Sequence, residues 1–481
     1  MSGETKENLK QQTKKGLYWS FFNQFAIYGM NFCVGIVMAR LLSPSDYGIT
    51  ALPAVFMAVA AVLQDCGMGG ALIRKDKIEE CDLATAFYYS IGVGIFMYLI
   101  LFFSASWIAE FYNTPVLVPL IRVTALTFLW GPLSTVQYVL LKRRLDFKTP
   151  TKISIITKII SAIIGITMAF CGYGLWALVV SGVLSSFMGL VIVWCIVRWR
   201  PKTGWSKKSF KYLWDYGNKM MASGLLETLY QNIAPVFIGK FYSPAELGVY
   251  NRAQGYAMMP SQNVTGVIQG VTFPVLSKMQ NDDEALARNY RRMLKATAFI
   301  IFPIMMMLSA LAHPLVIILV TAKWESCVIL LQIICFSLMW YPVHAINLNL
   351  LQVKGRSDLF LRLEIIKKIV GVSILAITLP HGLIVFCCGS VVSSLIALII
   401  NTYYTGKLIN VGYFKQMRDL LPIVLLGLVM FAMIHLSNYL IPNMLLQIIC
   451  GGILGAIVYI GGAILLKFSE LDDVKYMLKR K

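Results

Sequence analysis

The hexapeptide SPSDYG at residues 43–48 recurs as SPAELG at residues 243–248, an offset of 200 positions. A second pair of stretches lies 210 residues apart, with LLKRRLDF from Leu140 matching LLQVKGRS from Leu350. Self-similarity at a nearly constant offset is typical of an internal repeat. We therefore interpret most of the chain as two copies of one unit.

The composition of the chain is typical of an integral membrane protein. Of its 481 residues, 58% are hydrophobic and 14% are charged, which is too little charge for a water-exposed surface. Most of the apolar runs are long enough to cross a hydrocarbon core of about 30 Å, and they must be helical because lipid offers the backbone no partners. We expect fourteen spans, at 17–38, 49–73, 83–105, 117–140, 151–171, 174–197, 218–240, 254–277, 294–312, 327–350, 363–380, 383–405, 419–437 and 444–466.

The basic residues are distributed unevenly between the two ends of these spans. If the N-terminus is cytoplasmic, 37 of the 43 Lys and Arg residues fall on the cytoplasmic side, 5 fall outside, and Lys158 lies within a span. This asymmetry predicts an even number of spans with both termini in the cytoplasm. The formal charge of +20 therefore lies at the edges of the membrane, where basic residues contact anionic lipid headgroups. For this reason we do not expect a nucleic-acid partner.

The expected fold is an all-α integral membrane protein with 14 transmembrane helices, arranged as two parallel six-helix repeats plus two C-terminal helices. Six spans is an even number, so the two repeats have the same orientation in the membrane, as in many secondary transporters. The expected segments are a cytoplasmic N-terminal segment at 1–16, a six-helix half at 17–197, a basic and aromatic cytoplasmic linker at 198–217, a second six-helix half at 218–405, two additional helices at 419–466 and a basic cytoplasmic tail at 467–481.

Motifs of catalysis are missing from the sequence. The ten cysteines are scattered without a CxxC pair, and the four histidines are isolated from one another. The sequence has no HExxH, no GxSxG and no Walker loop, so the residues for metal, nucleophilic or ATP-driven chemistry are absent. We therefore expect neither an enzyme nor a cofactor or metal.

The repeated hexapeptide has the residues of a helix start. Ser43 is suited to the N-cap, Pro44 to the first helical position and Asp46 to the acidic position of a capping box. In the second copy, Ser243 and Glu246 occupy the corresponding positions. We expect each hexapeptide mainly to begin the second helix of its half.

Charged residues within the spans are the candidate functional residues. Each costs at least about 2.5–3.5 kcal/mol at the centre of a membrane, so its presence requires a reason. Cations suit phosphate binding, although each of them could instead extend to the headgroups. The candidate substrate-binding cations are Arg40, Lys158, Lys240, Arg252 and Lys368. The two deepest acids, Asp65 and Glu227, are candidates for ion coupling or for balancing a nearby cation.

Several motifs in order give the chain a specific resemblance. From about Leu17 to Pro422 it resembles the polysaccharide transporter family of the multidrug/oligosaccharidyl-lipid/polysaccharide exporter superfamily. Within that family it is most similar to flippases of the Wzx and colanic-acid type and to teichuronic-acid exporters. The strings that carry the resemblance are ARLLSPSDYG, LLKRRLDFK, RWRP, GKFYSPAELGVYNRAQ, SQNV, YRRML, NLNLLQVKGRSDLFLRLEIIKK and RDLLP.

The resemblance implies a flippase of the bacterial cytoplasmic (inner) membrane. Its substrate would be an oligosaccharide on undecaprenyl pyrophosphate, such as a repeat unit of O-antigen, capsule or exopolysaccharide. The expected partners are this glycan, membrane lipids, and the glycan polymerase and glycosyltransferases of the same pathway, with the flippase itself a monomer. Two alternatives remain open: a multidrug-type small-molecule antiporter of the same superfamily, and a membrane saccharide polymerase or ligase.

Overall fold

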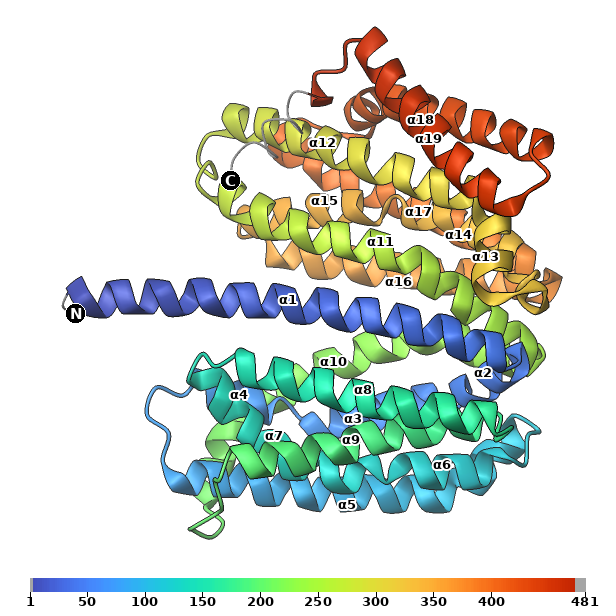
Figure 1. Cartoon of the computed structure of the whole chain (residues 1–481). Helices are drawn as coiled ribbons and strands as arrows, with labels where there is room; N and C mark the ends of the chain where they lie inside the picture. The colour runs from blue at the N-terminus through green and yellow to red at the C-terminus, as the bar shows by residue number, and fades with distance from the viewer. Residues whose placement is uncertain (1–2, 472–481) are drawn as a thin grey trace. The chain divides into compact units, whose positions relative to one another are not determined.

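The computed structural model describes residues 3–471, apart from the side chains of residues 3–18, 20, 21, 267 and 271. All regular elements in this range are helices (Figure 1). The first two residues of the expected segment 1–16, and residues 472–481 of the expected tail, lie outside the described residues. An all-helical fold is thus confirmed for the part of the chain that the structure describes.

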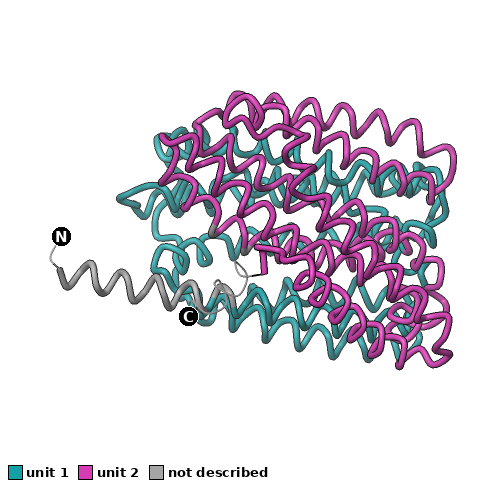
Figure 2. The backbone as a smooth tube through the Cα atoms, turned by 90° about the horizontal axis from the view of Figure 1, so that it is seen from above, with its two compact units in different colours: residues 1–248 teal, residues 249–481 magenta. Residues whose placement is uncertain are grey.

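The chain divides into two compact units, residues 1–248 and residues 249–481, coloured separately in Figure 2. The boundary between the units lies inside one long helix, α11 (Pro244–Ser277). Unit 1 therefore also contains the residues of the expected linker 198–217 and the first residues of the expected second half. Each unit is described separately below.

Unit 1 is built around the helix α5, which packs against α3, α6, α7 and α10. In a second group, α8 packs against α1 and α9. The core between α4, α5, α7 and α10 includes the buried residues Met68, Leu72, Phe87, Val136 and Leu213. The helices of this unit are α1 (Gly3–Leu41), α2 (Pro44–Ala51), α3 (Ala54–Asp65), α4 (Met68–Arg74), α5 (Glu80–Phe111), α6 (Leu117–Ala125), α7 (Thr127–Arg143), α8 (Lys148–Phe170), α9 (Trp176–Ile196), α10 (Lys207–Phe241) and the first turn of α11.

Unit 2 is built around α12, which packs against α14, α15 and α18. Its inner face carries fully buried side chains, among them Leu286, Tyr290, Leu294 and Phe302. The elements of this unit are the remainder of α11, then α12 (Asp283–Ala310), α13 (Ala312–Val320), η1 (Ala322–Trp324), α14 (Cys327–Leu338), α15 (Tyr341–Val353), α16 (Ser357–Thr378), η2 (Leu379–His381), α17 (Leu383–Ile409), α18 (Tyr413–Leu440) and α19 (Met444–Leu465).

Eleven helical segments of the described residues are long and apolar enough to cross a membrane, so the protein is a multi-span membrane protein. These segments correspond to eleven of the fourteen predicted spans. The predicted spans 218–240, 254–277 and 363–380 are helical as well, within α10, α11 and α16, but they are outside this set. Polar side chains lie within each of these three spans: Glu227 and Lys240 in the first, Gln254, Gln262, Asn263 and Gln269 in the second, and Glu364, Lys367 and Lys368 in the third.

The predicted helix starts are confirmed at both copies of the hexapeptide. Ser43 is the N-cap of α2, where its side chain accepts from Asp46 N and the Asp46 carboxylate accepts from Ser43 N at 2.9 Å. In the second copy, Glu246 N donates to Ser243 Oγ at 3.2 Å and Ser243 N donates to Glu246 Oε2 at 2.9 Å. Both are capping boxes, which satisfy the free N–H groups of the first helical turn.

The second repeated stretch ends its helix with the same turn in each copy. After α7, Leu145 has φ 55° and Asp146 N donates to Leu141 O at 3.0 Å. After α15, 210 residues later, Gly355 has φ 67° and Arg356 N donates to Leu351 O at 2.9 Å. Left-handed residues with this bonding are a common way of ending a helix. The two copies thus share local backbone structure as well as sequence.

Candidate functional site

The predicted cations of unit 1 lie at different depths of their helices. Arg40 is exposed in the last turn of α1, whereas Lys158 is half-buried near the middle of α8. Lys240 is exposed in the last turn of α10, where its Nζ donates to Phe111 O at 2.5 Å and lies 4.5 Å from the centre of the Phe111 ring. Lys240 thus connects the end of α10 to the end of α5.

The predicted cations of unit 2 lie on α11 and α16. The Arg252 guanidinium lies 5.3 Å from the ring centre of Trp324 and 5.6 Å from that of Tyr256. Trp324 is fully buried, so Arg252 is fixed by ring contacts of the cation–π type. Lys368 is half-buried on α16, and its neighbour Lys367 forms an ion pair of 2.5 Å with Glu364.

The two predicted acids are both exposed in unit 1. Asp65 is the last residue of α3, at the break where Cys66 and Gly67 adopt left-handed backbone angles. Glu227 lies in α10, where it accepts a hydrogen bond of 2.8 Å from Gln231. The seven predicted residues therefore lie in two units and on six helices, and their roles in binding or coupling stay predictions.

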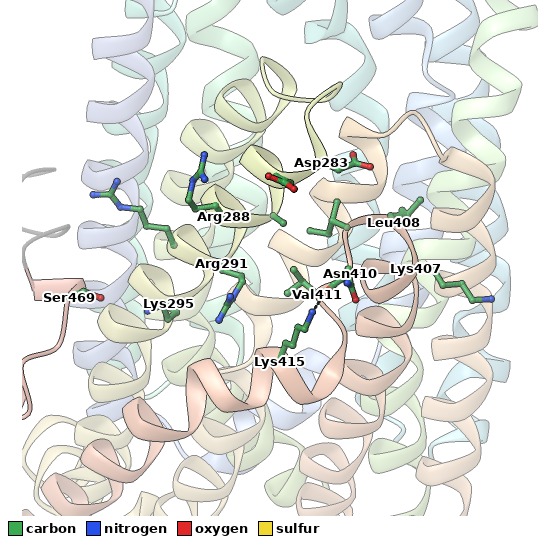
Figure 3. A pocket seen from close by; sticks show the side chains of 14 residues that line it. Asp283, Arg288, Arg291, Lys295, Lys407, Leu408, Asn410, Val411, Lys415 and Ser469 are labelled. Carbon is green, nitrogen blue, oxygen red and sulfur yellow. Dashed lines mark hydrogen bonds between the residues drawn. The ribbon is translucent and has the colours of Figure 1, made fainter.

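A large cavity in unit 2 is lined mainly by residues that the sequence interpretation had not singled out (Figure 3). It has a volume of about 970 Å³ and lies where α12 begins, α17 ends and α18 begins. We call it the basic recess. Its basic lining residues are Arg288, Arg291, Arg292, Lys295, Lys407 and Lys415, and its acidic ones are Asp283 and Glu284.

Ion pairs hold the walls of the basic recess together. Arg291 donates to both carboxylate oxygens of Asp419, at 2.7 and 2.6 Å, which fixes α12 to α18. Lys295 pairs at 2.6 Å with Glu470, whose side chain is 5% exposed. A two-pronged arginine–carboxylate pair has a defined geometry as well as a favourable energy, so this wall is well ordered.

Unit 1 contains a smaller cavity, of about 520 Å³. Arg74 and Lys219 line it together with Tyr212, Asp215 and Tyr216. The Arg74 guanidinium lies 5.2 Å from the centre of the Tyr216 ring. Like the basic recess, this cavity is formed by the segments whose Lys and Arg residues predict the cytoplasmic side.

A buried polar network crosses the interior of unit 2. Asn347 accepts from Thr405 Oγ1 at 2.8 Å and exchanges two hydrogen bonds of 3.2 Å with Gln416. Nearby, the two ring nitrogens of His344 lie 3.2 Å from Asn401 Nδ2 and 3.2 Å from Ser394 Oγ. Asn347, Asn401, Thr405 and Gln416 are at most 1% exposed. Hydrogen bonds compensate for burying most of these polar atoms, with Asn401 Oδ1 as the exception, so the network fixes the packing of α15, α17 and α18.

The sequence gives only part of the information needed to predict the basic recess and the buried polar network. In the sequence, the six cations of the basic recess indicate only topology, although the string YRRML at residues 290–294 concentrates charge. The sequence also presents His344 as isolated, because its partners are 50 and 57 residues away in the chain. Within the described residues, no group of three or more His, Cys, Asp or Glu side chains could hold a metal ion.

The chain is similar to proteins of polysaccharide biosynthesis. A family model described as "Polysaccharide biosynthesis protein" matches residues 37–329. The teichuronic acid biosynthesis protein TuaB of Bacillus subtilis is 23% identical over 431 residues, which cover 88% of this chain and 89% of TuaB. The succinoglycan biosynthesis transport protein ExoT of Rhizobium meliloti is 24% identical over 484 residues, which cover 98% of this chain and 96% of ExoT.

Among solved structures, the inward closed conformation of the lipid II flippase MurJ is similar in fold. The TM-score is 0.76 at 17% sequence identity, and the match covers 93% of this chain and 99% of MurJ. The family model extends over more than half of the chain, and the predicted resemblance is confirmed. The chain belongs to the polysaccharide biosynthesis protein family.

Proposed function

We propose that the protein is a flippase that moves a lipid-linked oligosaccharide across the bacterial cytoplasmic membrane. The substrate class is an undecaprenyl-pyrophosphate-linked repeat unit of a cell-surface polysaccharide. Family membership supports this class, as does the name of ExoT, which is a transport protein of polysaccharide synthesis. The pyrophosphate and hydroxyls of such a lipid cannot cross hydrocarbon unaided, so the protein must offer them a polar path.

The observation that carries the proposal is the presence of charged residues in or beside the predicted membrane spans, among them Arg40 on α1 and Lys158 on α8. The helices α10, α11 and α16 carry Glu227, Lys240, Arg252 and Lys368. Charges within a membrane are costly and typically face a water-filled interior or line a substrate path. A cation-rich path fits a pyrophosphate, which Arg and Lys bind well. We therefore assign substrate contact to Arg40, Lys158, Lys240, Arg252 and Lys368.

The proposed topology has fourteen spans, with α10, α11 and α16 completing the eleven apolar segments. Both termini are then cytoplasmic, and the halves 17–197 and 218–405 are parallel repeats followed by two helices at 419–466. Transport proceeds by alternating access, in which the halves rock about the substrate while the lipid tail stays in the bilayer. The protein acts as a monomer alongside the glycosyltransferases and the polymerase of its pathway.

The energy for directed transport comes from an ion gradient, the membrane potential or consumption of the glycan outside the cell. Each elementary charge that crosses the full potential supplies about 2.3 kcal/mol per 100 mV. Asp65 and Glu227 are the acids best placed to couple such a charge to the cycle.

Deletion of the gene in its host tests the proposal. Undecaprenyl-pyrophosphate-linked glycan should accumulate, and in spheroplasts it should resist a membrane-impermeant glycosidase. Wild-type protein should restore both glycan export and access by the glycosidase, whereas a Lys240→Gln variant should restore them poorly. The matched control is Lys202→Gln, which removes an exposed cation of the linker. If lipid-linked glycan does not accumulate in the deletion strain, the protein has another substrate.

A further inference from the structure

The break between α3 and α4 shapes the smaller cavity, that of unit 1. Cys66 and Gly67 both have left-handed backbone angles there, with φ 41° and 62°, so the helix is interrupted within its span. The helix α10 packs directly on this break, because a Cβ on Gly217 would stand 2.3 Å from Cys66 O. The cavity of about 520 Å³ is lined by α4 and α10, and we call it the α4–α10 cavity. Interrupted membrane helices commonly build the binding sites of transporters.

The end of α4 that carries Arg74 is firmly anchored. Arg143, the last residue of α7, donates to four backbone carbonyl oxygens within two residues of Arg74. The next residue in the chain, Lys75, forms an ion pair of 2.6 Å with Asp82, whose side chain is fully buried. Arg74 is thus presented to the α4–α10 cavity from fixed backbone.

The lining combines two cations, one acid and two tyrosines. Arg74 comes from α4, whereas Lys219, Asp215, Tyr212 and Tyr216 come from α10. The Arg74 guanidinium lies 5.2 Å from the ring centre of Tyr216, a contact that engages its positive charge rather than particular N–H groups. Lys219 and Asp215 stand one turn apart and are both exposed, yet they form no ion pair with each other within the residues that the structure describes. Their charged groups are therefore available to a ligand.

This mixture of groups favours a sugar phosphate over a bare phosphate. Arginine and lysine bind phosphate oxygens through charge-assisted hydrogen bonds. A carboxylate beside them repels a bare oxyanion, but it accepts hydrogen bonds from hydroxyl groups. Tyrosine adds a hydroxyl and an apolar ring on which the C–H face of a sugar can pack. The volume also lies within the range for sites that bind small molecules, roughly 300–1,000 Å³.

Apolar side chains beside the cavity suit a lipid that carries the sugar phosphate. Met220 in the lining is 51% exposed, and Ile73, next to Arg74, is 42% exposed. Tyr212, also in the lining, is 46% exposed, and exposed tyrosines are typical of the zone where headgroups meet acyl chains. A polyprenyl chain can therefore stay in the bilayer while its sugar phosphate occupies the cavity.

We propose that the α4–α10 cavity captures the sugar phosphate of the lipid-linked glycan before the glycan enters the transport path. This inference rests on the proposed function and adds a binding step to it. The cavity lies on the side that the proposed topology assigns to the cytoplasm, where the glycan is loaded. Arg74 and Lys219 bind the phosphates, and Asp215 accepts hydrogen bonds from the sugar hydroxyls.

The test is flipping in liposomes that contain increasing densities of a fluorescent undecaprenyl-pyrophosphate-linked oligosaccharide. Lys219→Gln should raise the half-saturating density about fivefold, and Arg74→Gln/Lys219→Gln about thirtyfold. The limiting rate should stay close to that of wild type, because capture precedes crossing and both side chains are exposed. Asp215→Asn should also raise the half-saturating density, since the sugar hydroxyls lose a charged acceptor. At a site for a bare phosphate, the same change would lower it.

The matched control removes the same charge elsewhere on α10. Lys207 and Lys208 are exposed at its start, and Lys207→Gln/Lys208→Gln should keep the half-saturating density of wild type. If Arg74→Gln/Lys219→Gln behaves like this control, or if Asp215→Asn lowers the half-saturating density, the inference is wrong while the proposed function stands. If wild-type protein does not flip the labelled glycan at any density, the proposed function fails and the inference fails with it. The wild-type protein thus distinguishes the two failures.

Discussion

Gly48 of the first hexapeptide lies directly against Pro244 of the second. A Cβ atom on Gly48 would stand 1.6 Å from the carbonyl oxygen of Pro244, and one on Gly248 would stand 2.0 Å from that of Pro44. The contact is thus reciprocal, as it is for elements related by a twofold axis. The glycine that ends each copy of the motif is needed for close approach of two backbones, in addition to the capping role of the preceding serine.

This relationship predicts that Gly48→Ala and Gly248→Ala destabilise the protein. The new methyl group would meet a backbone carbonyl, which cannot rotate away, so the helices must separate. Overpacking of this kind costs about 1–3 kcal/mol. Thermal unfolding in detergent should show a lower midpoint for both variants. Gly92→Ala is the control, because a Cβ at Gly92 meets nothing within 4 Å. If Gly48→Ala unfolds at the same temperature as Gly92→Ala, the contact is not close in the folded protein.

The ion pair between Lys75 and Asp82 gives a second prediction. Lys75 Nζ lies 2.6 Å from Asp82 Oδ2, and the Asp82 side chain is fully buried. Lys75→Met would leave a buried carboxylate without its cation, at a cost of about 3 kcal/mol in the free energy of unfolding. Asp82→Asn keeps a polar group and should cost less. Chemical denaturation of the two variants measures the difference, and an equal or reversed order would contradict this account of the pair.

The same pair predicts a pH dependence at the alkaline end. The hydrogen bond to Asp82 raises the pKa of Lys75 above its ordinary value. Because this pKa is higher in the folded state, protonated Lys75 contributes to the free energy of unfolding. The contribution is fully present below the pKa of lysine in the unfolded chain, about 10.4. That stability is lost as the pH rises through the folded pKa of Lys75. The unfolding midpoint of wild type should therefore fall in this range by more than that of Lys75→Met, and parallel curves would count against the prediction.

Local patterns in the sequence predicted local structure well. The capping boxes at Ser43 and Ser243 depend on neighbouring residues, and the structure contains both. The apolar runs likewise predicted the eleven apolar spans, because hydrophobicity and length suffice for that. The helices α10, α11 and α16 were placed correctly, although their polar side chains keep them outside that set.

Features that join distant segments could not be predicted in this way. The walls of the basic recess come from residues more than a hundred positions apart, such as Arg288 and Lys407. Each of these residues has the same local context as an ordinary basic residue at a membrane edge. In the same way, nothing near His344 in sequence indicates that Asn401 and Ser394 contact it. Only the packing of α15 against α17 brings these groups together.

The buried network around Asn347 gives a fourth prediction. Asn347→Leu would remove one hydrogen bond from Thr405 and two from Gln416, which would keep only their bonds to Asn401 O and Val411 O. Gln416→Leu would likewise remove two hydrogen bonds from Asn347. Each single variant should lose about 1–3 kcal/mol in the free energy of unfolding. The double variant should lose less than the sum of the two, because neither group is then left unpaired. Additive losses in a double-mutant cycle would show that the two amides do not interact.

The exposed acids of unit 1 give a fifth prediction, which concerns coupling. Asp65→Asn and Glu227→Gln remove a charge at nearly constant volume, so the protein should stay folded. If these carboxylates couple transport to an ion or to the potential, the variants should flip their substrate at a rate that no longer responds to the gradient. Flipping in vesicles with and without an imposed gradient measures this response. If both variants respond to the gradient as wild type does, Asp65 and Glu227 are not coupling sites. Transport driven by consumption of the glycan would then be the favoured account.

The central claim is tested most directly by reconstitution of the purified protein into liposomes that contain a fluorescent undecaprenyl-pyrophosphate-linked oligosaccharide. A membrane-impermeant quencher reports how much of the labelled glycan has reached the outer leaflet. The account predicts that the protein speeds this exchange well above that of empty liposomes, while a labelled phosphatidylcholine is not moved. Exchange of the glycan at the rate of empty liposomes, or equal exchange of the phospholipid, would contradict it.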